Sequence, residues 1–114
     1  TWGDKWRKQW GKEPVIFDTP EKARKYGKWL GNRYKNKSNI IWVMGGDRNP
    51  IKPSFVEINN AMAEGIKEGD KGKHLITFHP SGGHSSSEWF QKEKWLDFNM
   101  MQTGHSNLNP AVYN

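Results

Sequence analysis

The sequence predicts an α/β protein, and more specifically part of a (β/α)8 TIM barrel that covers about three central strands and their helices. Two observations support this class. Apolar strands alternate with amphipathic helices along the chain, and polar residues follow each predicted strand directly. Loops of this kind are typical of barrels and doubly wound sheets, which keep their chemistry at the carboxyl ends of parallel strands.

The size and composition of the chain restrict this interpretation. It has 114 residues, no cysteine and a net charge of +6. Three strands cannot close a barrel, so we expect residues 1–114 to be an internal fragment of a single TIM-barrel domain. No stretch is apolar and long enough to span a membrane. Most cations are lysines that lie among acids, which favours a solvated helix face over a nucleic-acid site.

The first half of the chain predicts a loop, a helix and a strand. Residues 1–17 have glycines, a proline and no clean period, so we expect an irregular loop. A helix follows over about residues 19–36, capped by Asp18 or Thr19, with Pro20 in its first turn. Its side chains at three- and four-residue steps predict the packing face: Ala23, Tyr26, Trp29, Leu30, Arg33 and Tyr34.

The strand over residues 40–44 is the centre of the predicted fold. Its five consecutive apolar residues indicate a strand buried on both faces. Gly45 and Gly46 then allow a tight turn that leads to Asp47. A carboxylate in this place can act as a general acid or base, or it can cap the next turn or pair with Arg48. Spacing alone leaves both interpretations open.

The rest of the chain repeats this pattern. A second helix is expected over residues 54–68, with an apolar stripe that includes Met62 and Ile66 and with Gly69 placed to end it. A second strand over residues 74–78 ends at His79. Ser85 and Glu88 have capping-box spacing and predict a short helix. Residues 95–101 alternate with period two and predict a third strand, which ends at Gln102 and His105.

Other kinds of site find little support in the sequence. His79, His84 and His105 with Asp97 match no compact metal-binding motif, so neither a metal nor a cofactor is expected. The segment that begins at Gly83 lacks the second glycine of a nucleophile elbow, which argues against a serine hydrolase. The positive charge and seven tryptophans are the only support for nucleic-acid binding.

Three blocks of the sequence resemble one family, the apiosidase-like glycoside hydrolases. Residues 40–50 are similar to its W-[VI]-[LM]-G-G-D-R-N-P block, residues 74–90 to its H-L-x-T-x-H-P and S-S-x-W-F run, and residues 95–105 to its W-L-D-F-N-M-x-Q-[ST]-G-H block. The resemblance implies that the fragment belongs to a TIM-barrel catalytic domain that acts on plant cell-wall pectic polysaccharide, outside the cell or in the periplasm. It implies that Asp47 is the catalytic proton donor and that the second carboxylate is a glutamate on a later strand, beyond this chain, so we expect the fragment to be inactive alone.

The sequence and the resemblance together predict a substrate site around Asp47. The expected partner is an oligosaccharide or polysaccharide, with no nucleic acid and no membrane; the oligomeric state is not predicted. Two alternatives stay open, a non-catalytic carbohydrate-binding relative and a basic nucleic-acid-binding domain. The expected substrate-binding residues are Arg48, Asn49, His79, Gln102 and His105, with Trp2 and Trp89 as stacking surfaces.

Overall fold

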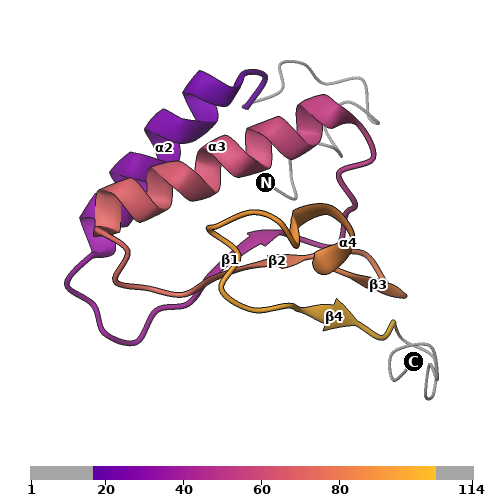
Figure 1. Ribbon diagram of the computed structural model, residues 1–114. Helices are drawn as coiled ribbons and strands as arrows, with labels where there is room; N and C mark the ends of the chain where they lie inside the picture. The colour runs from indigo at the N-terminus through magenta and orange to yellow at the C-terminus, as the bar shows by residue number, and fades with distance from the viewer. Residues whose placement is uncertain (1–16, 105–114) are drawn as a thin grey trace.

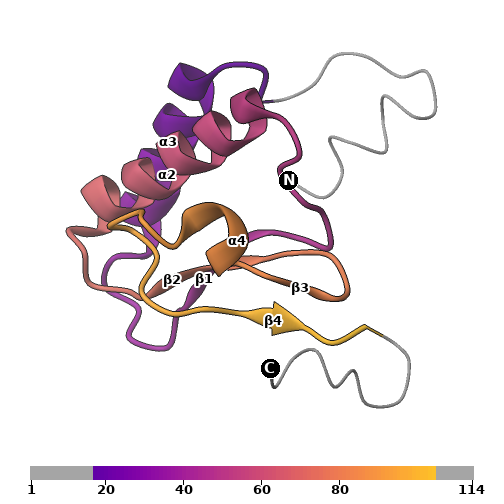
Figure 2. The same cartoon turned by 45° about the vertical axis from the view of Figure 1, so that its right-hand side comes forward.

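A computed structural model describes residues 17–104, in which helices cover one face of a small parallel sheet (Figure 1 and Figure 2). Residues 1–16 of the loop predicted for residues 1–17 lie outside the described residues, as do the site residues Trp2 and His105. None of the described helices is long and apolar enough to cross a membrane. In chain order the elements are α2 (Pro20–Tyr34), β1 (Trp42–Gly45), α3 (Pro53–Asp70), β2 (Ile76–His79), β3 (His84–Ser85), α4 (Ser87–Phe90) and β4 (Met101–Gln102).

The centre of the fold is a strand–helix–strand unit. β1 and β2 are parallel, with Trp42 opposite Ile76 and Gly45 opposite His79. α3 connects the two strands and lies over the sheet (Figure 1). The prediction of two parallel strands joined by a helix is therefore confirmed. Because the strands are parallel, the residues that follow β1 and β2 emerge at the same edge of the sheet.

The two faces of this sheet differ in burial. Met44, Ile76 and Phe78 belong to the core that the strands form with the helices. On β1 the other face is open, and Val43 is 50% exposed. The prediction that residues 40–44 are buried on both faces is thus wrong for this structure, because the described helices cover only one face of the sheet. Ile41, just before β1, is 56% exposed for the same reason.

α2 starts as the sequence predicts but packs through a different face. The Thr19 hydroxyl accepts a hydrogen bond from the Lys22 N–H at 3.3 Å, so Thr19 is the cap. Of the predicted packing face, Ala23 is buried and Leu30 half-buried, whereas Trp29 is 54% exposed. Tyr26, Arg33 and Tyr34 are exposed as well. The buried positions of α2 are instead Ala23, Gly27 and Gly31.

Glycines on both helices explain this packing. A Cβ atom at Gly31 would lie 2.4 Å from the Ile66 carbonyl oxygen, and one at Gly65 would lie 2.3 Å from the Arg24 carbonyl oxygen. Gly27 and Gly69 face the opposite backbone in the same way. We call these four residues the glycine interface. Since no side chain separates the two backbones there, α2 and α3 pack closely without the large aromatic residues of α2.

Gly69 is part of this interface and does not end α3. The prediction that it ends the helix is wrong, because α3 continues to Asp70. The helix ends at Lys71, whose backbone is left-handed with a φ of 61° and whose N–H donates to the Lys67 carbonyl.

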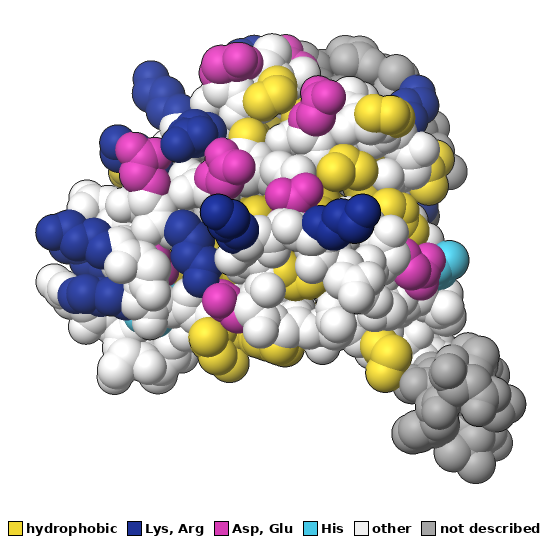
Figure 3. All heavy atoms as spheres, in the orientation of Figure 1, with side chains coloured by type: hydrophobic (Ala, Val, Ile, Leu, Met, Phe, Trp, Pro, Cys, Tyr) yellow, Lys and Arg dark blue, Asp and Glu magenta, His cyan; other side chains and the backbone are white. Residues whose placement is uncertain are grey.

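Ion pairs connect the exposed sides of the two helices. The Arg24 guanidinium lies 3.0 Å from the Glu64 carboxylate, and the Lys28 ammonium lies 2.6 Å from the Glu68 carboxylate. Figure 3 shows cationic and anionic side chains mixed over this face of the molecule. All four side chains are between 41% and 58% exposed, so each pair stabilises the fold only weakly.

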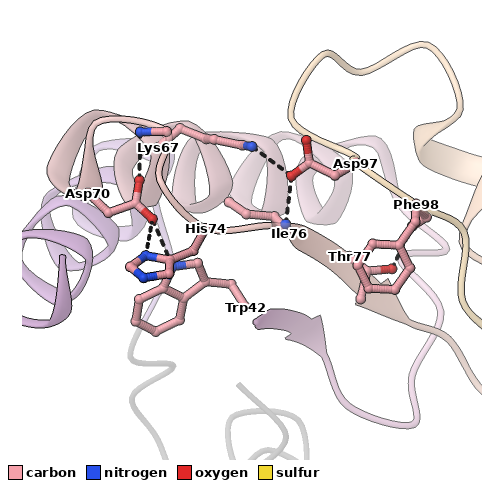
Figure 4. Close-up of polar contacts among 9 residues, drawn as sticks. Trp42, Lys67, Asp70, His74, Ile76, Thr77, Asp97 and Phe98 are labelled. Atoms are coloured by element: carbon pink, nitrogen blue, oxygen red, sulfur yellow. Dashed lines mark hydrogen bonds and ion pairs between the residues drawn. The ribbon is translucent and has the colours of Figure 1, made fainter. Parts of the chain in front are cut away.

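The third predicted strand does not form over most of its length. Residues 95–100 are not a strand, and only Met101 and Gln102 pair, antiparallel with β3. The reason is visible beside β2 (Figure 4). The Asp97 N–H donates to the Ile76 carbonyl at 2.9 Å, and the Asp97 carboxylate accepts from the Ile76 N–H at 2.7 Å. A side chain, not a backbone carbonyl, therefore satisfies the Ile76 N–H.

A buried polar cluster connects the amino-terminal ends of β1 and β2 (Figure 4). The carboxylate of Asp70, at the end of α3, accepts hydrogen bonds from the Trp42 indole at 3.0 Å and from the Gly72 N–H at 2.8 Å. The His74 Nδ1 lies 2.9 Å from the same carboxylate, and its Nε2 lies 2.6 Å from the Lys37 carbonyl oxygen. Asp70 and His74 are both buried, so these contacts satisfy polar groups that water cannot reach.

Candidate active site

The end of β1 has an unusual backbone. Gly45, Gly46 and Asp47 all have positive φ, at 77°, 129° and 57°. A Cβ atom at Gly45 would lie 2.6 Å from the Phe78 ring, so the first position also requires glycine for space. Among the described residues, the other non-glycine residue with positive φ is Lys71, which ends α3. Asp47 is exposed at the end of this turn.

His79 holds the turn from the neighbouring strand. Its carbonyl oxygen accepts from the Gly46 N–H at 3.2 Å, and its Nδ1 accepts from the Asp47 N–H at 3.1 Å. A nitrogen that accepts a backbone hydrogen bond carries no proton, so in the neutral ring the proton is on Nε2. His79 and Asp47 are thus in direct contact at the carboxyl ends of β1 and β2.

Asn49 connects the loops that follow these two strands. Its side-chain oxygen accepts a hydrogen bond from the Ser81 N–H at 2.9 Å. Arg48, between Asp47 and Asn49, is half-buried. The loop after β1 is therefore fixed to the loop after β2 at two places, through His79 and through Asn49.

Gln102 joins the same edge through the hairpin of β3 and β4. It lies opposite His84, and its backbone carbonyl accepts from the Gly83 N–H at 2.7 Å. Its side-chain oxygen is buried and has no hydrogen-bond partner in the described part of the chain. The described residues thus leave one buried acceptor of this hairpin unused.

Trp89 packs against β2 and β3. It is half-buried on α4, and its ring centroid is 6.4 Å from that of Phe78 and 5.5 Å from that of His84. Phe78 belongs to the core between the sheet and the helices, so Trp89 lies on that side of β2. The sequence-predicted residues that the structure connects near Asp47 are therefore Asn49 and His79, with Gln102 beside the Ser81–Gly83 loop.

Two other carboxylates have structural contacts. The Asp97 carboxylate accepts from the Ile76 N–H and lies 2.6 Å from the Lys67 ammonium. Ile76 starts β2 and His79 ends it, so Asp97 binds the end of the strand opposite His79. Burial raises the pKa of Glu88, but hydrogen bonds from the Ser85 N–H and from His84 outweigh it and leave the pKa lowered. No group of three histidine or acidic side chains in residues 17–104 is arranged to hold a metal ion.

The left-handed backbone of Asp47 is the feature that the sequence analysis missed. Two consecutive glycines before an aspartate were a usable signal, since aspartate tolerates this conformation better than most residues. The result is an exposed carboxylate on a constrained turn, beside an imidazole. Such a carboxylate can donate or accept a proton at a substrate bound over the strand ends.

Comparisons with known proteins relate the chain to glycoside hydrolases. A family model for the catalytic domain of apiosidase-like proteins matches residues 1–114. The chain is similar to the crystal structure of a glycoside hydrolase family 5 protein from Bacteroides vulgatus, with 47% identity, a TM-score of 0.69, and coverage of 76% of this chain and 18% of that one. A second structure, described as a glycoside hydrolase, has 46% identity and a TM-score of 0.68, with 75% of this chain and 19% of that one covered.

The chain thus spans less than a fifth of the length of either structure. No curated protein matches it. Because the model for this catalytic domain covers the whole sequence, including the strand that leads to Asp47, the chain belongs to the apiosidase-like family.

Proposed function

We propose that the protein is a glycoside hydrolase of plant cell-wall pectic polysaccharide, in which Asp47 protonates the leaving oxygen. The observation that carries this proposal is the position of Asp47. It is exposed at the carboxyl end of a parallel strand, on a turn that His79 holds through two hydrogen bonds. In barrels this is the edge where catalytic residues lie. The described β1–α3–β2 unit is then one repeat of a (β/α)8 barrel.

The reaction requires a second carboxylate on the other side of the scissile bond. Glu88 and Asp97 have structural partners, which supports a carboxylate other than these two as the partner of Asp47. We propose a glutamate on a later strand of the whole protein. A separation of about 5 Å from Asp47 would give retention of configuration, and about 6.5–9.5 Å would give inversion.

The neighbours of Asp47 suit a polyhydroxylated substrate. His79 in its neutral form has an Nε2–H to donate, and the side chain of Gln102 is an amide, which can both donate and accept. We assign the substrate subsite to these two residues together with Arg48 and Asn49. The net charge of +6 is compatible with an anionic polysaccharide such as pectin. Such a substrate implies a protein that works in the periplasm or outside the cell.

An Asp47→Asn variant of the full-length protein tests the proposal. Because asparagine cannot donate an acidic proton, turnover of an apiose-containing pectic oligosaccharide should fall by about 10²- to 10⁴-fold, with an unchanged circular dichroism spectrum. The control is Glu57→Gln, which removes an exposed carboxylate on α3 and should leave turnover unchanged. Near-normal turnover by Asp47→Asn would reject Asp47 as the proton donor.

A second candidate is a carbohydrate-binding relative without activity. The contacts of Glu88 and Asp97 favour it, because neither carboxylate is then available as the second catalytic carboxylate beside Asp47. Calorimetry of the full-length protein with the oligosaccharide distinguishes the candidates. Binding without any turnover, in a protein that also lacks a carboxylate opposite Asp47, would support the binding protein.

A further inference from the structure

We propose that His79 is a positioning residue: its ring holds the Asp47 backbone in the left-handed conformation and thereby fixes the direction of the carboxylate. The inference rests on the proposed function of Asp47. It concerns Nδ1 and is separate from the substrate contact proposed for the Nε2–H of His79, and it makes separate predictions for kcat and KM.

The first step of the argument is the backbone itself. An L-residue with positive φ has its Cβ close to the neighbouring peptide, so this conformation is disfavoured for Asp47. Gly45 and Gly46 adopt positive φ without that penalty, but they only bring the chain to Asp47. A stabilising contact at Asp47 is needed to keep it there. Such strain at an element's end is common at active sites.

The second step is that His79 supplies this contact. Two successive N–H groups, of Gly46 and Asp47, both donate to His79, one to its carbonyl and one to its Nδ1. His79 is itself fixed, because it ends β2 opposite Gly45 and lies between the buried residues Phe78 and Pro80. His79 is therefore the anchor, and Asp47 is the group that it places.

The third step separates the two ring nitrogens. The Asp47 N–H occupies Nδ1, so this nitrogen is not available to the substrate. An asparagine at position 79 can place its side-chain oxygen close to the position of Nδ1. It would keep the acceptor and lose Nε2–H. Alanine loses both, and glutamine moves the oxygen one bond further from the backbone.

Kinetics of full-length variants with the pectic oligosaccharide test the inference. We expect His79→Ala to lower kcat by about fivefold to tenfold, the usual effect of losing one hydrogen bond, whereas the loss of the Nε2–H should change KM equally in His79→Ala and His79→Asn. His79→Asn should retain kcat within about twofold, and His79→Gln should behave like His79→Ala. The control is His84→Ala, which removes a histidine that pairs with Glu88 and should leave kcat unchanged. If His79→Ala fails to fold, His79→Gln against His79→Asn makes the same test.

A double variant tests whether His79 acts through Asp47. If it does, adding His79→Ala to Asp47→Asn should not lower kcat further, because the carboxylate that His79 places is already absent. Independent losses that multiply would overturn the inference. So would a rise in KM at constant kcat in both His79→Asn and His79→Ala, because that pattern indicates direct substrate contact.

Crystal structures of the variants provide a readout that does not depend on activity. Asp47 should keep its positive φ in His79→Asn and lose it in His79→Ala. If Asp47→Asn remains active while this φ pattern is found, the proposed function fails but His79 still places the Asp47 backbone. If Asp47→Asn is inactive and φ stays positive in His79→Ala, the positioning role fails and the proposed function stands.

Discussion

Replacing Gly31 with alanine gives a sharp test of the glycine interface, because its two consequences have opposite signs. Alanine is the better helix former, which should stabilise α2 by about 1 kcal/mol. The new Cβ, however, would lie 2.4 Å from the Ile66 carbonyl oxygen and 3.0 Å from the Asp70 nitrogen. Both atoms belong to the α3 backbone and cannot rotate away as a side chain can.

The size of the effect follows from these distances. Ordinary contact begins at 3.4 Å, so α2 and α3 must separate by about 1 Å at Gly31, which loosens contacts along both helices. Overpacking of this kind costs about 1–3 kcal/mol, and a clash with backbone belongs at the upper end. After the gain in helix propensity, we expect Gly31→Ala to destabilise the protein by about 2 kcal/mol.

Urea unfolding of the full-length protein is the assay, with Lys25→Ala as the control. Lys25 is exposed on the same helix, so its replacement should change the free energy of unfolding by less than about 0.5 kcal/mol. A Gly31→Ala protein that is as stable as the wild type, or more stable by about 1 kcal/mol, would show that α2 and α3 are not in backbone contact and would refute the reasoning.

Two further predictions concern charged groups on α3 and beside β2. Asp97→Ala leaves the buried Ile76 N–H without its acceptor and should lower the free energy of unfolding in urea by about 1–3 kcal/mol. Asp97→Asn retains an acceptor and should lower it less; equal losses would contradict this interpretation. The hydrogen bond from Lys28 lowers the pKa of Glu68 below its ordinary value of 4.5. The stabilisation of the fold by the charged Glu68 is therefore complete above pH 4.5 and is lost as the pH falls through the lowered pKa. The stability difference between the wild type and Glu68→Gln, measured across the acidic range, should therefore shrink toward low pH; a difference that grows would contradict the pairing.

Much of the fold could be predicted from local signals. The cap at Thr19, the apolar stripe of α3 and the polar residues after each strand are short-range patterns, and they correctly place the β1–α3–β2 unit. The positions of Asp47 and His79 at one edge follow from this unit alone. Their roles in catalysis remain predictions.

The errors arose where tertiary contacts decide the structure. Gly31 and Gly69 contribute nothing to a hydrophobic pattern, although their spacing to Gly27 and Gly65 was the signal of close helix packing. The alternation over residues 95–101 suggested a strand, but Asp97 satisfies the Ile76 N–H with its side chain. A sequence pattern does not show which partner a backbone group will find.

The Asp70–His74–Trp42 cluster has a consequence for how new specificities could arise in this protein. It anchors the end of the strands opposite Asp47 with side chains that are buried or half-buried, whereas the loops around Asp47 are short and are held by the side chains of His79 and Asn49. Substitutions at the other loop positions can therefore accumulate without loss of either set of contacts. Libraries aimed at altered sugar preference should vary residues 51–52 and 81–83 and leave Asn49, His79 and the anchored end untouched.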